Sequence, residues 1–391
     1  MNDTMQLTFE ALDTLFFREA LPMDQAGGVE LSSVFPPPTR TVVGAIRTLI
    51  GEALGVDWQA FKREESPLND LLGTHDRLGR LRFRGPYLLY RGERLYPAPG
   101  LLLRTTLVAD TVGAKPVYVR LAPDLRKPVH CDLGRVFLPA LSAKGTISAV
   151  KPLEKAFLTG NGLKAVLSGA TPSHEDVIAR KVLYVEESRL GIGRDNRSGT
   201  VIESLLYQTR HLRLGPDPED GPVQIGMEVV GLDDTHFLKS PRWIRFGGES
   251  RMASVTRGVP ASLAVPEAPD SPNGIFVTLL THARFGESGK PDWLPPRFSD
   301  ATHEGAKCWT GTIAGVSLRL VSCVIGKTIR EGGWDLARHC PRPVRSLIPA
   351  GSVYFFQVLS SSCEEAVTAI HGTHLGHDNE WGRGELAAGY W

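Results

Sequence analysis

At 391 residues the chain is too long for one ordinary hydrophobic core, so we expect two domains. Hydrophobic residues make up 42% of it and charged residues 22%, which excludes a largely disordered chain. No apolar run approaches the roughly 20 residues that span a bilayer, and the N-terminus lacks the basic-then-apolar pattern of a secretory signal. Five scattered cysteines do not suggest a disulfide framework, so we expect a reduced, cytoplasmic location without membrane contact.

The formal net charge of +1 conceals a bias among the 44 basic residues, of which 32 are arginine and 12 are lysine. Arginine presents a rigid fork that matches phosphate and a plane that stacks on bases. A GC-rich genome would also enrich arginine. The clustering of arginines therefore carries more information than their total.

The first predicted elements are a strand and a helix. Residues 6–16 alternate between apolar and polar side chains, which predicts a half-buried strand. After the prolines at 36–38, Thr39 or Thr41 can cap a helix that ends near Leu54. The face of this helix opposite its apolar stripe carries arginine and glycine at i, i+4, i+7 and i+11, namely Arg40, Gly44, Arg47 and Gly51.

From about residue 56 to 180 the pattern is irregular and indicates an insertion. Arginines at 77–94 are interleaved with tyrosines, and residues 152–169 can hold a helix. Regular patterning returns with a hairpin over 181–213, whose turn is rich in glycine. A short helix candidate ending near Phe237 then precedes the glycine-rich residues 247–251.

A proline-rich linker over 260–272 precedes a second unit. This unit is predicted to hold a strand over 275–281, a hairpin over 311–326 with its return strand at 353–359, and a helix over 363–370. Each unit has the element order of a βαββαβ domain. We therefore predict an α+β protein with two ferredoxin-like (RRM-like) domains, residues 1–262 with the insertion and residues 263–391. No RNP1 motif is present, so stacking of bases on a sheet face is not indicated.

Signals for an enzyme or a metal are weak. The tripeptide 326–328 reads Gly-Lys-Thr, but position 321 is valine where a phosphate-binding loop needs glycine. The glycine pair at 191 and 193 lacks the third glycine of a dinucleotide fingerprint. His371, His374 and His377 have no accompanying cysteine pair, so we expect them to face solvent or phosphate and to hold no metal.

Several motifs in a fixed order carry a resemblance to one family. They lie at 35–47, 84–86 with 96–99, 191–194, 247–251, 326–327, 333–336 and 349–354. Together they resemble the RAMP-superfamily third subunit of the CRISPR type III-B (Cmr) complex. The match is poorest between residues 100 and 175.

The resemblance implies a non-catalytic subunit without a cofactor, which binds the 5′ handle of the guide RNA. It also implies docking of the large polymerase/cyclase-like subunit and the first backbone RAMP subunit, with only indirect contact to target RNA. Glycine loops and a helix start that can bind phosphate nominate as RNA-binding residues Arg40, Thr41, Gly44, Arg47, Arg194, Arg197, Gly247, Gly248, Arg251, Gly382 and Gly384. Arginine and tyrosine are enriched at protein interfaces, which nominates as partner-binding residues Arg82, Arg84, Tyr87, Tyr90 and Arg91.

Other interpretations remain open. Gly44 and Gly51 would equally allow close helix–sheet packing, Gly247 and Gly248 would suit an ordinary loop, and the arginine run suits a solvated face. A RAMP endoribonuclease that processes CRISPR repeat RNA would share the duplicated fold and use histidine for acid–base cleavage. No histidine spacing in this chain nominates such a residue. A purely structural scaffold would contact no RNA.

Overall fold

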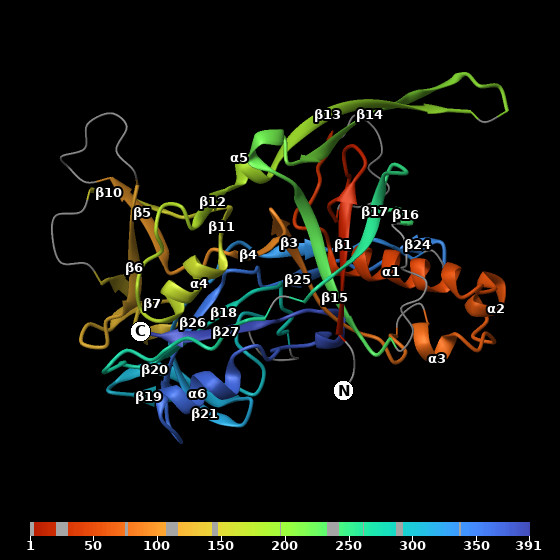
Figure 1. The fold of residues 1–391 in the computed structure, drawn as a ribbon. Coiled ribbons are helices and arrows are strands. Elements are labelled where there is room, and N and C mark those ends of the chain that lie inside the picture. The colour runs from red at the N-terminus through yellow and green to blue at the C-terminus, as the bar shows by residue number, and fades with distance from the viewer. Residues whose placement is uncertain are drawn as a thin grey trace.

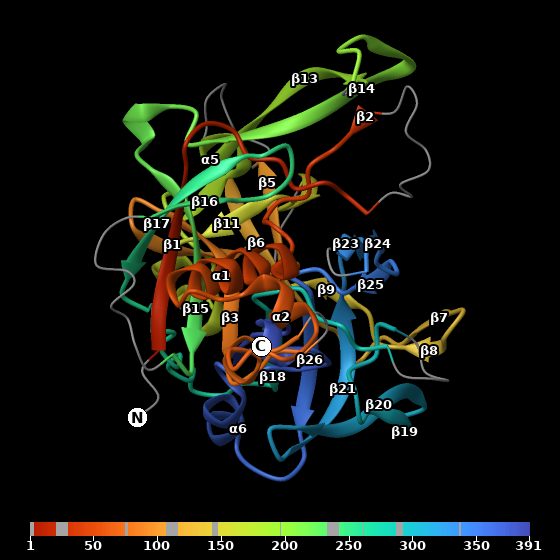
Figure 2. The same ribbon diagram turned by 90° about the vertical axis from the view of Figure 1, so that its right-hand side faces the viewer.

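The structure is a computed structural model that describes residues 4–20, 30–74, 77–106, 116–142, 148–195, 197–232, 242–260, 262–286, 292–335 and 338–391. It is a mixed α+β, sheet-rich protein with few helices, and two large antiparallel sheets form its body (Figure 1). A long two-stranded arm projects from the body (Figures 1 and 2). None of the helices in the described ranges is both long and apolar enough to cross a membrane.

The first sheet has eight strands. Their spatial order is β12 (Val177–Ala179), β11 (Ala156–Leu158), β4 (Glu93–Pro97), β3 (Arg82–Tyr90), β15 (Val223–Val230), β1 (Thr4–Ala11), β17 (Met252–Gly258) and β16 (Arg242–Arg245). β1 pairs antiparallel with both β15 and β17, and β15 pairs with β3. The first strand is thus flanked by two strands that come much later in the chain.

Helix α1 (Thr39–Ala53) packs beside this sheet and confirms the predicted helix. Its apolar stripe is buried at 2% exposure or less. β1 confirms the predicted strand but is not half-buried, because residues 5–9 are covered on both faces. Gln6 tolerates this burial because its side-chain oxygen accepts a hydrogen bond from the Tyr87 hydroxyl at 2.8 Å.

The predicted insertion is only partly separate from the sheet. Four strands, β3, β4, β11 and β12, lie within residues 56–180, yet they belong to the eight-stranded sheet. The remainder adds a four-stranded sheet in the order β10 (Ser148–Pro152), β5 (Leu102–Thr106), β6 (Val117–Pro123) and β9 (Pro139–Leu141). It also carries the helices α4 (Gly160–Leu167) and α5 (Arg180–Leu183), and α4 confirms the helix predicted over 152–169.

The predicted hairpin over 181–213 forms as β13 (Tyr184–Arg194) and β14 (Val201–Leu214). It does not join the main sheet. Instead it pairs with β2 (Glu30–Leu31), forms an isolated bridge between Leu212 and Leu15, and projects as the arm. The short helix predicted to end near Phe237 lies outside the described residues.

The second sheet has six strands, in the order β19 (Ser299–His303), β20 (Ala306–Ile313), β21 (Val316–Val324), β26 (Val353–Val358), β18 (Ile275–Leu279) and β27 (Leu386–Tyr390). The predicted hairpin and its return strand are confirmed as β20, β21 and β26. Helix α6 (Cys363–Ile370) confirms the predicted helix and begins with a capping box between Ser362 and Glu365.

Short elements connect these parts. They are α2 (Trp58–Lys62), α3 (Asn69–Leu72), η1 (Pro218–Asp220), η3 (Asn379–Trp381) and three two-stranded ribbons, β22 (Ile329–Glu331) with β25 (Arg345–Leu347), β23 (Trp334–Asp335) with β24 (Cys340–Pro341), and β7 (Val129–Cys131) with β8 (Gly134–Val136).

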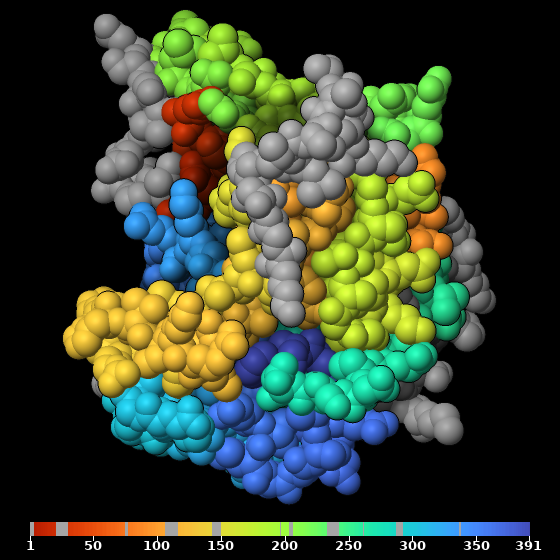
Figure 3. All heavy atoms as spheres, turned by 90° about the vertical axis from the view of Figure 1, so that its left-hand side faces the viewer, coloured from red at the N-terminus to blue at the C-terminus, as the bar shows by residue number. Residues whose placement is uncertain are grey.

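The buried side chains form three hydrophobic clusters. One lies around the first sheet and another around the second. A third joins the insertion to the second unit, because Leu163, Val166 and Leu167 of α4 pack with Phe276 and Ala387. Figure 3 shows this face, with the yellow-green insertion against the blue C-terminal residues. The insertion therefore ties the two sheets into one body.

Candidate nucleic-acid interface

Two of the predicted RNA-binding arginines lie on one face of α1, and the first of them contacts the second unit. The Arg40 guanidinium lies 4.5 Å from the centre of the Trp381 ring, which belongs to η3. Arg47, two turns along the helix, donates to the Thr74 carbonyl oxygen. Burial, together with the positive charges of Arg342 and Arg40, lowers the pKa of Arg47 to about 10. These cations are crowded and partly withdrawn from water.

Arg383 is the most buried member of the same region. Its side chain is 2% exposed and pairs with Glu331 on β22. Its Nε and Nη1 atoms are also buried, and among the described residues neither has a hydrogen-bond partner. A buried guanidinium with unused donors is unusual, because unpaired buried polar groups are costly.

Two predicted glycines place Arg383. Gly382 and Gly384 have φ values of +96° and +68°, which favour glycine. A Cβ on Gly382 would lie 2.4 Å from the Gly85 carbonyl oxygen, and one on Gly384 would lie 2.0 Å from that of Leu375. These glycines therefore serve close backbone packing that turns the intervening arginine inward.

Further arginines of the second unit complete the group. Arg284 donates to both carboxylate oxygens of Asp378, at 3.0 and 3.2 Å, and Arg345 lies 3.4 Å from the same carboxylate. Arg342 lies 3.2 Å from the carboxylate of Asp335. We call this group the arginine cluster, and it comprises Arg40, Arg47, Arg284, Arg342, Arg345 and Arg383 with the carboxylates Glu331, Asp335 and Asp378.

The cluster holds more guanidinium groups than carboxylates, so it carries a local positive excess. Arg40 illustrates this balance. Burial lowers its pKa first, Glu331 and Asp378 raise it, and Arg342 and Arg383 lower it. A site of this kind suits a phosphate-bearing ligand, because guanidinium forks match phosphate oxygens.

Thr41 and Gly44 lie in the first turns of the same helix. The Thr41 backbone N–H donates to the Pro38 carbonyl oxygen at 2.9 Å, so it is not free to bind an anion. Gly44 is exposed, and a Cβ built on it would meet nothing within 4 Å. Gly51 does allow close packing, since its Cβ would lie 2.9 Å from the Trp58 ring, but the neighbour is helix α2 and not a sheet. Gly44 has no such contact.

The other predicted RNA-binding residues lie in separate places. Arg194 and Arg197 are at the tip of the arm, where the Arg194 guanidinium donates to the Gly199 carbonyl oxygen at 2.9 and 3.1 Å. Arg197 is exposed. Both can reach a ligand only where it passes the arm.

The glycine-rich residues 247–251 form the tight turn between β16 and β17. The Gly248 N–H donates to the Phe16 carbonyl oxygen at 2.7 Å, and a Cβ on Gly247 would lie 2.4 Å from that oxygen. This backbone serves internal packing, as the ordinary-loop interpretation expects. Arg251 approaches Asp13 at 3.4 Å, in an ion-pair group with Arg189 and Arg213.

The predicted partner-binding residues divide by exposure. Arg82, Arg84 and Arg91 are exposed and Tyr90 is half-buried. Tyr87 is 4% exposed, and its ring lies 4.1 Å from the buried Arg94 guanidinium. Tyr87 is therefore a core residue in this chain, and its predicted contact with a partner is corrected.

The three clustered histidines, predicted to face solvent or phosphate, are not fully exposed. His371, His374 and His377 are half-buried, and their Nε2 atoms have no hydrogen-bond partner within the described part of the chain. That part contains no group of three or more side chains placed to hold a metal ion.

Sequence reasoning missed the second-unit half of the cluster, namely Arg284, Arg342, Arg345 and Arg383. The one local signal was the pair of glycines around Arg383, which indicates a tight backbone turn but not where the arginine side chain lies. The other three follow no short motif. Only the packing of η3 and the 329–347 ribbons near α1 brings them together.

Comparison with known proteins supports the family resemblance that the ordered motifs indicate. The chain matches the family model of the CRISPR-associated protein (Cas_Cmr3) over residues 7–391. No curated protein matches it. Among solved structures it is similar to a chain of the type III-B Cmr-beta complex bound to cognate target RNA and AMPPnP, with 14% identity, TM-score 0.47 and coverage of 90% of this chain and 86% of that chain.

A second type III-B Cmr-beta structure, bound to cognate target RNA, gives 15% identity, TM-score 0.44 and the same coverage. A chain of the Csm3-Csm4 subcomplex of the type III-A interference complex gives 10% identity, TM-score 0.37 and coverage of 90% and 93%. The family model spans nearly the whole chain, and the protein therefore belongs to the Cmr3 family of CRISPR-associated proteins, subunits of the type III-B Cmr effector ribonucleoprotein.

Proposed function

We propose that this chain binds the 5′ handle of the guide RNA at the arginine cluster and performs no chemistry itself. The excess of six guanidinium groups over three carboxylates in the cluster, where Arg345 is exposed, is the observation that carries the proposal. Phosphate oxygens would offset this positive excess. The contacts are expected to go mainly to the RNA backbone, which fixes register without reading bases.

The same proposal assigns a use to the exposed Gly44. Glycine inside a helix costs roughly 0.5–1 kcal/mol relative to alanine. With no neighbour to accommodate, Gly44 lets an RNA backbone approach α1 closely between Arg40 and Arg47. Arg194, Arg197 and Arg251 remain secondary contacts, reached where the RNA extends toward the arm.

We further propose that the exposed side chains of Arg82, Arg84 and Arg91, with the half-buried Tyr90, contact the large polymerase/cyclase-like subunit. The arm supplies a second docking surface, for the first backbone RAMP subunit. Ile192 and Leu206 are cross-strand neighbours at 48% and 56% exposure, and Leu190 lies two residues before Ile192 at 76%. A contiguous apolar stripe on a projecting ribbon is typical of a protein contact.

The strand orders support the finer fold proposal. In each large sheet the first strand lies between the third and fourth, with the second beyond the third, as β3-β15-β1-β17 and as β21-β26-β18-β27. This is the order of a βαββαβ unit. We propose two ferredoxin-like RAMP domains, residues 1–262 and 263–391, in a cytoplasmic complex that meets target RNA through the guide.

The test is equilibrium binding of a handle-containing guide RNA to the purified chain over a range of salt concentrations. Arg40→Gln with Arg345→Gln removes two charges from the cluster without touching the Arg383–Glu331 pair. The slope of log affinity against log salt should fall by about 1.4, because each lost phosphate contact on a single strand removes about 0.7.

Arg126→Gln with Lys127→Gln is the matched control, because both residues are exposed and lie outside the cluster. An unchanged slope in the cluster variant would refute the handle site. Cleavage of repeat RNA by the isolated chain without a metal ion would instead favour the endoribonuclease alternative.

A further inference from the structure

A second basic site lies in the insertion, in the part of the chain that the family motifs match least. A hollow of about 670 Å³ opens between the four-stranded sheet and α5, and an adjoining hollow of about 400 Å³ shares Arg104, Leu153 and Glu154 with it. We call the two together the insertion groove. Its basic lining residues are Lys151, Arg104, Lys155, His174, Arg180 and Lys181.

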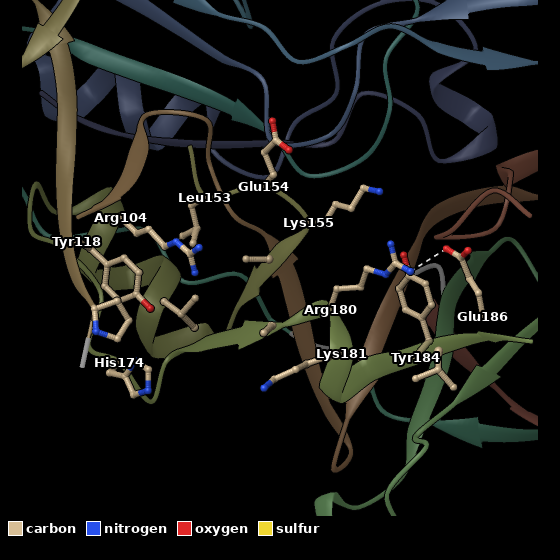
Figure 4. Close-up of a pocket in the computed structure, with 15 residues that line it drawn as sticks. Arg104, Tyr118, Leu153, Glu154, Lys155, His174, Arg180, Lys181, Tyr184 and Glu186 are labelled. Atoms are coloured by element: carbon tan, nitrogen blue, oxygen red, sulfur yellow. Dashed lines mark hydrogen bonds and ion pairs between the residues drawn. The ribbon is translucent and has the colours of Figure 1, made fainter. Parts of the chain in front are cut away.

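The cations come from both walls and from the edge of the groove. Figure 4 shows Arg104 of β5 and Tyr118 of β6 on one side, and Arg180 and Lys181 of α5 on the other. Lys155 sits in the turn before β11, where its φ of +52° holds the backbone in an unusual conformation. The convergence of three elements makes this more than a row of solvated lysines on one strand.

Most of this charge is uncompensated. Arg180 is satisfied, because it lies 2.7 Å from Glu186 and its guanidinium covers the Tyr184 ring at 4.9 Å. Arg104, Lys155 and Lys181 are exposed and make no ion pair within the described ranges. Five lysines and arginines line the groove against the carboxylates of Glu154 and Glu186, so its lining carries a positive excess.

A tyrosine hydroxyl in the groove also suits a phosphate-bearing ligand. The Tyr118 side chain is 8% exposed, and its hydroxyl points into the hollow. Burial raises the pKa of this hydroxyl, so it remains a neutral hydrogen-bond donor. Neutral donors beside cations are the groups that usually bind phosphate oxygens.

We propose that the insertion groove binds single-stranded RNA through its phosphates, at a site separate from the arginine cluster. Cations spread through two adjoining hollows fit a ligand that carries a negative charge at every nucleotide. Tyr118 and Tyr184 are both 8% exposed, so neither ring is open for base stacking, and binding should be independent of sequence. A protein partner would instead be expected to bury exposed aromatic anchors, which this groove lacks among its described lining residues.

The test uses an oligouridine of about 12 nucleotides, within the range that single-strand sites cover, and therefore no handle sequence. Binding is measured in the Arg40→Gln, Arg345→Gln background, so that the arginine cluster does not mask the groove. Adding Arg104→Gln, Lys155→Gln and Lys181→Gln should weaken binding about tenfold and lower the salt slope by about 2, at about 0.7 for each cation.

Lys62→Gln, Arg126→Gln and Lys127→Gln remove the same charge from exposed positions outside the groove and should leave the slope unchanged. Equal slopes in the groove and control variants would overturn the proposal, as would displacement of the RNA by polyglutamate at equal charge concentration, which would indicate a site for acidic protein segments. Failure here leaves handle binding by the cluster intact, because the two measurements use different RNAs and different residues.

Discussion

The arginine cluster and the insertion groove both gather positive charge, but they hold it in opposite ways. In the cluster, Arg383 is 2% exposed and depends on Glu331, and Arg284 is held by Asp378 in a bidentate pair. In the groove, Arg104, Lys155 and Lys181 are exposed and unpaired within the described residues. Burial demands partners for a charge, whereas water accommodates one without them. Cations in the cluster should therefore support folding as well as binding, and those in the groove binding alone.

The two sites should differ most in how much stability is lost when a carboxylate is removed from each. Glu331→Gln leaves Arg383 buried without its counter-charge, and breaking one side of a buried pair typically costs about 3–5 kcal/mol of unfolding free energy. Glu154→Gln at the exposed edge of the groove should change stability by less than about 0.5 kcal/mol. Urea denaturation of both variants measures the two effects. Similar values for the two would contradict the division.

Acid should destabilise the fold through buried histidines, of which His282 lies beside the cluster residue Arg383. His282 accepts a hydrogen bond from the Ala350 N–H, and burial together with the nearby positive charge of Arg383 lowers its pKa to about 4. Because the unfolded chain keeps a pKa near 6.5, it takes up the proton first as pH falls, and stability is lost between about pH 6.5 and pH 4. The expected loss from pH 7 to pH 5 is about 1–2 kcal/mol.

His282→Asn keeps an acceptor for Ala350 but cannot titrate, so it should flatten this part of the pH profile. The measurement is the unfolding free energy at pH 7 and pH 5. The triple groove variant, whose substitutions lie among exposed residues, should retain the wild-type profile. An equal loss in the His282→Asn variant would show that other groups cause it.

The smallest expected change in stability comes from Gly44→Ala, which also tests whether RNA lies against α1. Gly44→Ala should stabilise the free chain by about 0.5–1 kcal/mol, because the exposed helix gains propensity and the new methyl group meets nothing within 4 Å. The same change should weaken handle-RNA binding if the backbone lies against α1. Thermal unfolding and RNA titration together check it.

Gly51→Ala provides the contrast on the same helix, since its methyl group would lie 2.9 Å from the Trp58 ring and should destabilise the chain. Gly44→Ala with unchanged RNA affinity would move the RNA path away from this face of α1.

Much of the fold followed from local pattern. The helices at 39–53 and 363–370 carry apolar stripes at helical spacing, and their ends lie within a residue or two of the predicted ends. The hairpin pairings followed too, but the neighbours that each hairpin or strand takes within a sheet did not. Nothing in the alternation of residues 184–214 distinguishes a sheet strand from a projecting arm, because sheet membership depends on what covers the other face.

The candidate site was predictable only in halves. Arg40 and Arg47 were visible as a helix face, but their counterparts on the second unit lie about 300 residues later and share no motif with them. The prediction that Gly247 and Gly248 bind phosphate had a similar weakness. Gly247 and Gly248 have the composition of a phosphate-binding loop, yet their amide and Cβ space are taken by Phe16, a contact that no local pattern reveals.

The third hydrophobic cluster has a consequence for how the molecule is made. The apolar side of α4 is closed by Phe276 and Ala387, and Gly389 packs against the Leu167 backbone. A ribosome therefore delivers the insertion long before the strand that completes its core. Until β27 pairs with β18, the nascent chain exposes this apolar surface to solvent. We therefore expect a chaperone that binds apolar segments to associate with the chain during synthesis.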